Sequence, residues 1–287
     1  MAYASFEELL AAANTHGSLG KAALEIEIAE TGANAPELRA RMRETLGVMR
    51  DAVGTGLSGN ARSRSGFVGG DASKVASSQA GPLGGTFADT IAAALATGEV
   101  NAAMGRIVAA PTGGASGVLP AVVLTVGAQT SASEEALTEA LFAAAGIGGV
   151  IATRATLSGA AGGCQAEIGS GAAMAAAAAV ELSGGTPAQA GHAAALALQG
   201  QMGLVCDPIG GLVEVPCVYR NATGAAVALA AAEMALAGVE FPVPFDEVVD
   251  AMGFVGRSLP PSLRETALGG LATTPAGRDM AARAREK

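Results

Sequence analysis

The chain has 287 residues, of which 50% are hydrophobic but only 3% are aromatic, and it contains no Trp. Its 26 acidic and 17 basic residues give a net charge of −9, which argues against a nucleic-acid partner because such proteins present a basic footprint. The length suits one large domain or two small ones, and the abundance of Ala and Gly predicts tightly packed helices.

The N-terminus lacks the features of a secretory signal. Met1–Leu10 carries Glu7 and Glu8 and has no basic region before an apolar run. The longest apolar run, Gly171–Val180, is mostly Ala and ends at Glu181, so it is too short and too weakly apolar to span a bilayer. We therefore expect a cytoplasmic protein with reduced thiols and no membrane association.

Helical spacing begins near the N-terminus. Short helices are predicted at Phe6–Asn14 and Lys21–Thr31. Pro36–Val53 is a stronger amphipathic helix, because apolar residues recur at i, i+4, i+8 and i+11, namely Leu38, Met42, Leu46 and Met49.

Gly54–Gly85 differs from the segments around it, because its many glycines are interspersed with Ser and Asn. This composition is that of a flexible linker. Linkers seldom need charged residues, however, and this segment contains Arg62, Arg64, Asp71 and Lys74. A functional loop that binds an anionic group is therefore the alternative interpretation, and both stay open.

The remaining chain returns to helical patterns. Helices are predicted at Thr86–Thr97, Val100–Ile107, Ser133–Ala145, Ser170–Leu182, Pro187–Gln199, Asn221–Ala237, Phe245–Gly253 and Pro261–Ala267. Gly146–Gly149 is expected to end the helix that begins at Ser133, and Thr186 is expected to cap the helix that follows it. The helix Ser170–Leu182 is almost entirely Ala and must be buried, whereas Gly269–Lys287 is predicted to be a fraying tail.

Strand signals are weak. Alternation of apolar and polar residues is short where it occurs, as at Val213–Val218, and no pattern of strands alternating with helices is present. We therefore predict a mainly α fold, a single compact Ala/Gly-rich helical domain over residues 1–287. Its expected parts are N-terminal helices at 1–53, a glycine-rich loop at 54–85, a helical core with the cysteine-bearing loops at 86–272 and a tail at 273–287.

A second glycine-rich turn, Ala109–Pro120, leads directly into the apolar run Val118–Val126. It can direct several backbone N–H groups at an anion near a helix N-terminus. The phosphate-binding pattern G-x-x-x-x-G-K-S/T is absent, so a carboxylate is the better match. A tight turn before a buried helix is the alternative.

All three cysteines of the chain, Cys164, Cys206 and Cys217, lie beside Gly or Pro turn formers, so their thiols can converge. The short C-x2-4-C pairs of structural zinc sites are absent, and a disulfide framework would leave one thiol over. A [4Fe-4S] cluster takes four thiolates, so three would leave one iron with an open position and Lewis acidity. Three separate buried thiols in a core are the alternative.

Several motifs carry a resemblance to a known family. They are N-A-A-M-G at Asn101–Gly105, Ala110–Pro120, G-A-A-G-G-C-Q-A-E-I-G at Gly159–Gly169, G-L-V-C-D-P-I-G-G-L-V-E-V-P-C-V-Y-R-N at Gly203–Asn221 and L-R-E-T-A-L-G-G-L-A at Leu263–Ala272. Together they resemble the α chain of bacterial iron–sulfur L-serine dehydratase over nearly the whole chain. One departure is Gly113-Gly114-Ala115-Ser116, where many members carry A-G-S-A or N-G-A-A.

The resemblance implies a [4Fe-4S] cluster held by Cys164, Cys206 and Cys217, and deamination of the small amino acid L-serine to pyruvate and ammonia. It also implies a separate β chain and thus a hetero-oligomer. No pyridoxal phosphate is expected, because none of the three lysines lies in a motif for that cofactor. The open iron would hold the substrate hydroxyl and carboxylate while a base removes the Cα proton.

The catalytic base is expected on the β chain, with Lys74 as the candidate within this chain. His16 and His192, the only histidines, are more typical of structural or surface positions.

The substrate is expected to lie near the loop formed by Thr112, Gly113, Gly114, Ala115 and Ser116. The candidates for its carboxylate are Arg62, Arg64 and Arg220. Arg220 could instead tune the charge of the cluster or pair with Asp207 or Glu214.

Two other function classes stay open. One is a related iron–sulfur lyase acting on L-cysteine or another β-substituted amino acid. The other is a non-catalytic interaction subunit whose thiols bind zinc.

Overall fold

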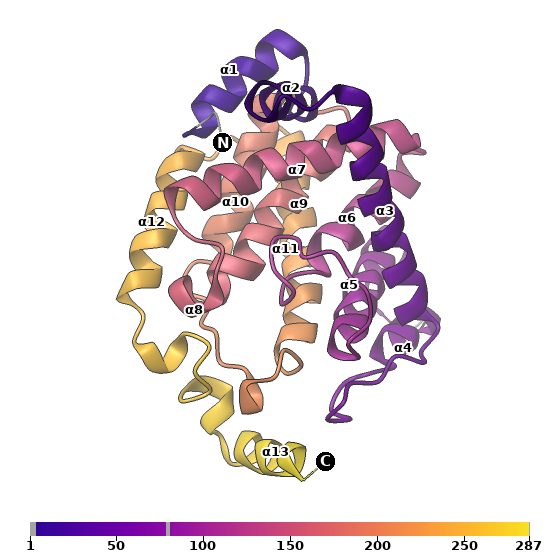
Figure 1. Cartoon of the computed structure of the whole chain (residues 1–287), viewed down its shortest axis with the longest axis vertical. Helices are drawn as coiled ribbons and strands as arrows, with labels where there is room; N and C mark the ends of the chain where they lie inside the picture. Colours follow the sequence, from indigo (N-terminus) through magenta and orange to yellow (C-terminus); the bar gives the residue numbers. More distant parts are fainter. Residues whose placement is uncertain (1–3, 79–80, 287) are drawn as a thin grey trace.

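A computed structural model describes residues 4–78 and 81–286, which form thirteen α helices (Figure 1). The α helices are α1 Phe6–His16, α2 Leu19–Thr31, α3 Ala35–Leu57, α4 Asp71–Ser77, α5 Thr86–Ala102, α6 Val118–Gln129, α7 Glu134–Arg154, α8 Gly159–Gly162, α9 Ser170–Leu182, α10 Pro187–Gly200, α11 Cys217–Leu236, α12 Phe245–Ser258 and α13 Pro275–Arg285. The short elements are the π-helical turn η1 Gln165–Gly169 and the 3-10 turns η2 Ile209–Gly211, η3 Pro261–Leu263 and η4 Gly270–Thr273. Within the described ranges the strand-like pairing is limited to one isolated bridge between Cys206 and Arg264, so the predicted mainly α fold is confirmed.

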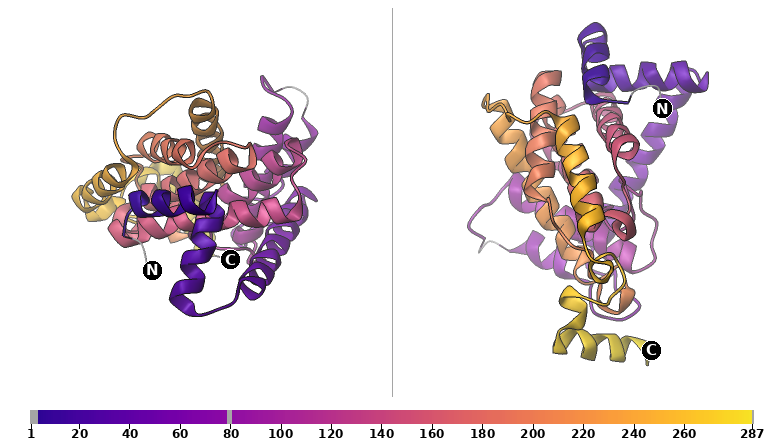
Figure 2. Two further views of the ribbon diagram at one scale, coloured as in Figure 1. Left: turned by 90° about the horizontal axis from the view of Figure 1, so that it is seen from above. Right: turned by 90° about the vertical axis from the view of Figure 1, so that its left-hand side faces the viewer.

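Helix α9 is the centre of the bundle. Every residue from Ser170 to Val180 is buried, and the helix packs against α6, α7, α10 and α11 (Figures 1 and 2). Small side chains permit this density, because they let helix backbones approach closely. Close packing at a small residue also joins α3 to α5, where a side chain at Gly56 would clash with the backbone of Ala96. The predicted buried alanine helix is therefore confirmed.

The N-terminal helices begin where short polar side chains cap them. The hydroxyls of Ser5 and Ser18 and the amide oxygen of Asn34 accept backbone N–H groups in the first turns of α1, α2 and α3. The first two helices lie at the opposite end of the molecule from α13, as both views show (Figures 1 and 2).

Glycine was the least reliable guide to helix ends. Helix α7 was expected to end at Gly146–Gly149 but continues to Arg154, because these glycines are buried at helix contacts rather than at a turn. A side chain at Gly148 would press on Met174 of α9. Helix α5 is also continuous through Gly98 to Ala102, not split into two helices with the second ending at Ile107, because Gly98 packs on Val218 of α11.

Four further predictions are corrected, at loops, at the tail and at the start of one helix. The glycine-rich segment 54–85 contains helix α4, and the tail contains helix α13, which Thr274 caps by accepting the N–H of Gly277. The predicted helix Pro261–Ala267 is only the turn η3, because Glu265 and Ala267 have positive φ angles of 65° and 56°. Helix α11 begins at Cys217, four residues before the predicted Asn221.

Helix α7 is also the one helix in residues 4–78 and 81–286 with the length and apolar composition to cross a membrane. Its apolar window is 72% buried inside the fold, as in the core helix of a globular domain.

Two carboxylates meet where α2 joins α7 and α9. Glu181 accepts the N–H of Gly20 at 3.1 Å, and Glu139 accepts the hydroxyl of Ser18 at 2.7 Å. Burial, with repulsion from Glu139 as a smaller cause, raises the pKa of Glu181 from 4.5 to about 7. The folded chain thus holds this proton more tightly than the unfolded chain does. The resulting stability is fully present below pH 4.5 and is lost as the pH rises through about 7.

Glu181→Gln should therefore flatten the decline in stability between pH 5 and pH 8. The neutral amide keeps an acceptor for Gly20 and removes the buried charge. The substitution should reduce the loss of unfolding free energy between the two pH values by at most about 3 kcal/mol. A shift of one pKa unit corresponds to about 1.4 kcal/mol. Urea unfolding at both pH values measures it, with exposed Glu135→Gln as the matched control. An equal decline in wild type and in Glu181→Gln would contradict the assignment.

Candidate active site

The three cysteines lie at three separate turns of the chain, namely before η1, in the loop before η2 and at the start of α11. Cys164 follows Gly163, whose φ of 77° turns the chain before η1. The N–H of Cys206 donates to Leu263 O at 2.9 Å, and the N–H of Glu265 donates to Cys206 O at 2.7 Å. Cys217 is the first residue of α11. Burial and the electrostatic effects of the thiols on one another indicate that these turns place them in one region.

All three thiols are free and buried, with exposed fractions of 2% at Cys164 and Cys206 and 8% at Cys217. Interaction with the Cys206 side chain is the main cause that holds the pKa of Cys164 below its ordinary value. The same pairing, together with burial, raises the pKa of Cys206. Burial raises the pKa of Cys217 to about 12, and the charge of Cys164 adds to this effect. The three sulfurs therefore form one electrostatic unit.

Arg220 is locked beside these thiols. Its Nη2 lies 2.8 Å from Asp207 Oδ1, and its Nη1 donates to Val205 O at 2.8 Å. The guanidinium also faces Cys164. Pairing with Asp207, one of the roles predicted for Arg220, is confirmed.

Sequence reasoning did not single out Glu167, which lies three residues after Cys164. Its Oε1 accepts the Thr112 hydroxyl at 2.6 Å, and its Oε2 lies 3.9 Å from Cys206 Sγ. Burial is the main cause that raises the pKa of this carboxyl, and the charge of Glu265 adds to it. The signal was present in the C-Q-A-E motif, where a carboxylate stands one helical turn from a cysteine.

The loop Thr112–Ser116 lies against Glu167 and is held from behind by two amides. Asn101 Nδ2 donates to Gly113 O at 3.0 Å, and Asn221 Nδ2 donates to Gly114 O at 2.8 Å. Ala115 and Ser116 are fully buried, whereas Thr112, Gly113 and Gly114 are partly exposed.

The N–H groups of Thr112, Gly113 and Gly114 find no acceptor among the described residues. They precede α6, so the partial positive charge of that helix N-terminus lies behind them. The carboxylate site predicted at this loop stays a prediction.

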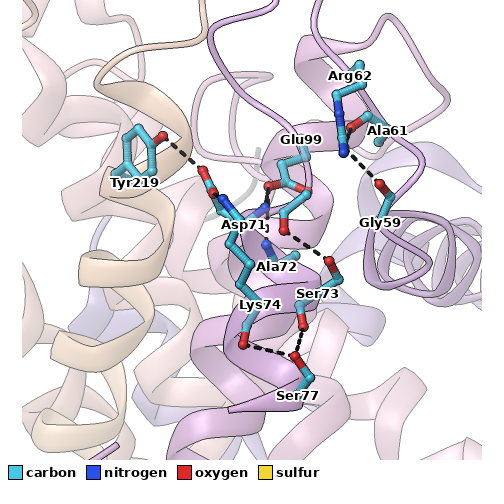
Figure 3. Close-up of polar contacts among 11 residues, drawn as sticks. Gly59, Ala61, Arg62, Asp71, Ala72, Ser73, Lys74, Ser77, Glu99 and Tyr219 are labelled. Carbon is cyan, nitrogen blue, oxygen red and sulfur yellow. Dashed lines mark hydrogen bonds and ion pairs between the residues drawn. The ribbon is translucent and has the colours of Figure 1, made fainter. Parts of the chain in front are cut away.

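Lys74 lies apart from the thiols on the exposed side of α4. Its Nζ is 2.6 Å from Asp71 Oδ1, and the side chain is 75% exposed. Tyr219 of α11 donates to the other oxygen of Asp71 at 3.0 Å, as Figure 3 shows. This ion pair and the exposure of the side chain favour a structural role for Lys74.

The glycine-rich segment around Lys74 is joined to the cysteine loops and does not behave as a linker. Ser65 donates a hydrogen bond to Glu214, which lies in the turn before Cys217. Buried Glu99 accepts the N–H groups of Asp71 and Ala72 at the start of α4 (Figure 3). These contacts fix the segment against the site.

The other candidates do not meet the thiols. Arg62 donates to Gly59 O and Ala61 O within its own loop, and Arg64 is exposed (Figure 3 draws Arg62). His192 Nδ1 accepts the N–H of Phe241 at 3.2 Å, and His16 is in the last turn of α1. The structural role expected of His192 agrees with this contact.

The thiols do not form a site for a single ion. Among the residues that the structure describes, no three His, Cys, Asp or Glu side chains converge on one metal position. In a polynuclear cluster each thiolate binds a different metal atom, so the thiolates need not converge on one metal position.

Gly159 supplies the space that the site needs. A side chain there would clash with Glu167 Oε2 and would lie 3.2 Å from Cys206 Sγ. Gly159→Ala should therefore destabilise the fold by about 1–3 kcal/mol, the usual cost of overpacking. Urea unfolding measures the change.

Gly47→Ala on α3 is the matched control, because nothing lies within 4 Å of its added methyl group. It should be neutral or stabilise by up to about 1 kcal/mol, since Ala favours helices. Equal unfolding free energies for the two variants would contradict the crowding at Gly159.

Known proteins match this chain over most of its length. A family model described as serine dehydratase alpha chain matches residues 14–272. The chain is 48% identical over 264 residues to the probable L-serine dehydratase alpha chain of Bacillus subtilis, covering 90% of this chain and 86% of that protein. It is 44% identical over 260 residues to the L-serine dehydratase alpha chain of Peptoniphilus asaccharolyticus, covering 90% and 89%. The match to the L-serine dehydratase of Streptomyces coelicolor is 43% over 181 residues, covering 62% and 40%.

Proposed function

Because the chain belongs to the serine dehydratase alpha chain family, we propose that it is the cluster-bearing subunit of an L-serine ammonia-lyase. The observation that carries the proposal is the meeting of three buried thiols with Arg220 and Glu167, beside a loop with free N–H groups. Thiolates are the ligands that iron–sulfur clusters require.

The residues fit a [4Fe-4S] cluster held by Cys164, Cys206 and Cys217. The donor set is all sulfur and buried, and the Arg220 guanidinium beside Cys164 offsets the negative charge of thiolates. A bound cluster with three protein ligands would supply an open iron, a Lewis acid that assists departure of the substrate hydroxyl.

The chain's own groups would orient the substrate. The N–H groups of Thr112, Gly113 and Gly114 are the proposed carboxylate site, while the buried Ala115 and Ser116 support them. Arg62, Arg64 and Lys74 are not needed for this role.

The reaction removes the Cα proton and the Cβ hydroxide of L-serine, which together make water, and leaves 2-aminoacrylate. Tautomerisation and hydrolysis of that product give pyruvate and ammonia without further catalysis. The histidines and Lys74 are engaged away from the thiols, so we place the base on a β chain.

The wider organisation follows from the same comparison. Relatives named alpha chains are matched over most of their length, whereas the match covers 40% of the Streptomyces protein. We propose that the remaining functions of that protein lie here on a separate β chain. In this assignment residues 1–287 form one α-chain domain, with 86–272 as its cluster-binding core.

Each of Cys164→Ser, Cys206→Ser and Cys217→Ser should lose iron and activity, because a serine oxygen is a poor ligand for a soft cluster. Iron and sulfide assays on protein purified under nitrogen measure the loss. Ser258→Ala, on the exposed side of α12, is the control and should load fully. Full iron content in Cys206→Ser, or zinc in place of iron in the wild type, would overturn the cluster assignment.

The cluster-loaded α chain alone should make pyruvate well below the roughly 10 per second typical of enzymes. Adding the β chain should raise the rate by supplying the base and closing the site against water. Pyruvate release from L-serine measures it, with L-cysteine as the competing substrate. Full activity of the isolated α chain would place the base in this sequence, and a preference for L-cysteine would redefine the substrate.

A further inference from the structure

Glu167 is the half-buried carboxylate that faces the thiols, and its two oxygens have different surroundings. Oε1 accepts the hydroxyl of Thr112 at 2.6 Å. Among the described residues Oε2 has only the thiol of Cys206, at the long distance of 3.9 Å. A contact of this length is a weak hydrogen bond, so Oε2 has no strong donor.

A carboxylate oxygen without a donor in a partly buried site is costly, and the surrounding charges increase the cost. Glu265 acts on Glu167 as a second negative charge. The nearby guanidinium of Arg220 is already committed to Asp207 and Val205. Oε2 therefore calls for a cationic hydrogen-bond donor that the described residues do not supply.

The position of Glu167 relative to the glycine loop identifies the donor. A side chain at Gly114 would lie 3.2 Å from Glu167 Oε1, so this carboxylate borders the three free N–H groups of Thr112–Gly114. An α-amino acid carries a carboxylate and an ammonium on one carbon atom. Adjacent anion and cation sites of this kind match both groups at once.

We propose that Glu167 is a substrate-binding and specificity-determining residue that receives the α-ammonium of the amino acid. This inference rests on the proposed function, because it assigns a role within the same site. It predicts that the site discriminates amino acids from carboxylic acids that lack the amino group. The ammonium has three donors, and one of them can satisfy Oε2 while the neighbouring N–H groups hold the carboxylate.

Two unreactive ligands test the proposal. L-alanine and propionate differ only in the α-ammonium, and neither carries a hydroxyl that could leave. Calorimetry on the cluster-loaded α chain gives both dissociation constants, with iron content and circular dichroism recorded for every variant. The wild type should bind L-alanine more tightly than propionate. Glu167→Gln should weaken L-alanine binding by about 10- to 100-fold, the usual effect of a charged hydrogen bond, and should leave propionate unchanged.

Two further variants separate charge from local structure. Glu233→Gln removes a carboxylate charge from the exposed side of α11 and leaves Glu167 in place, so it should retain the preference for L-alanine. Glu167→Asp keeps the negative charge but moves it away from the site, because its side chain is shorter. It should lose part of the preference for L-alanine over propionate while keeping its iron. It serves as the test variant if Glu167→Gln does not load with iron.

The outcomes distinguish this inference from the function on which it rests. A wild type that releases pyruvate from L-serine with its β chain, while Glu167→Gln keeps the full L-alanine preference, overturns the inference alone. Unchanged ligand binding with a lost pyruvate rate would make Glu167 a base and would also overturn it. A wild type that makes no pyruvate and binds neither ligand would overturn both.

Discussion

The ion pair between Arg220 and Asp207 ties the loops of the site to one another. Arg220 belongs to the start of α11, whereas Asp207 follows Cys206 on a different loop. The second oxygen of Asp207 accepts the N–H of Leu271 at 2.7 Å, which adds the C-terminal loop to the same network. Removing either partner would leave a buried charge unpaired, a loss of several kcal/mol. The positions of the thiols therefore depend on this pair more than on any single helix.

The rest of the fold supports this arrangement by fixing the ends of the helices that carry the loops. Alanine and glycine let α9 sit among four neighbours at close range, so small shifts of one helix are opposed by many contacts. The Asn221 side chain then links α11 to the glycine loop through both Gly114 and Gly117. A rigid scaffold of this kind holds the thiols and the substrate loop in fixed register, which precise chemistry requires.

Sequence patterns predicted the elements whose signal is local. The buried Ala helix α9 and the Thr186 cap followed from composition and position, whereas the convergence of the three thiols on one cluster stays a prediction from their turn-forming neighbours. Glycine was ambiguous, because Gly146 marks a close helix contact and Gly163 marks a turn, and only tertiary packing separates the two uses. Glu167 was missed for a related reason. Its importance comes from Thr112, which is 55 residues away in sequence.

A zwitterion suits this site better than a simple anion would. Glu167 and the neighbouring Glu265 bring negative charge to the site, and the chain as a whole carries a net charge of −9. A carboxylate alone would approach against this field and would gain only the N–H groups of the loop. An amino acid brings its own positive charge to the acidic side and its negative charge to the N–H groups. In the proposed assignment the chain therefore selects its substrate by matching a dipole.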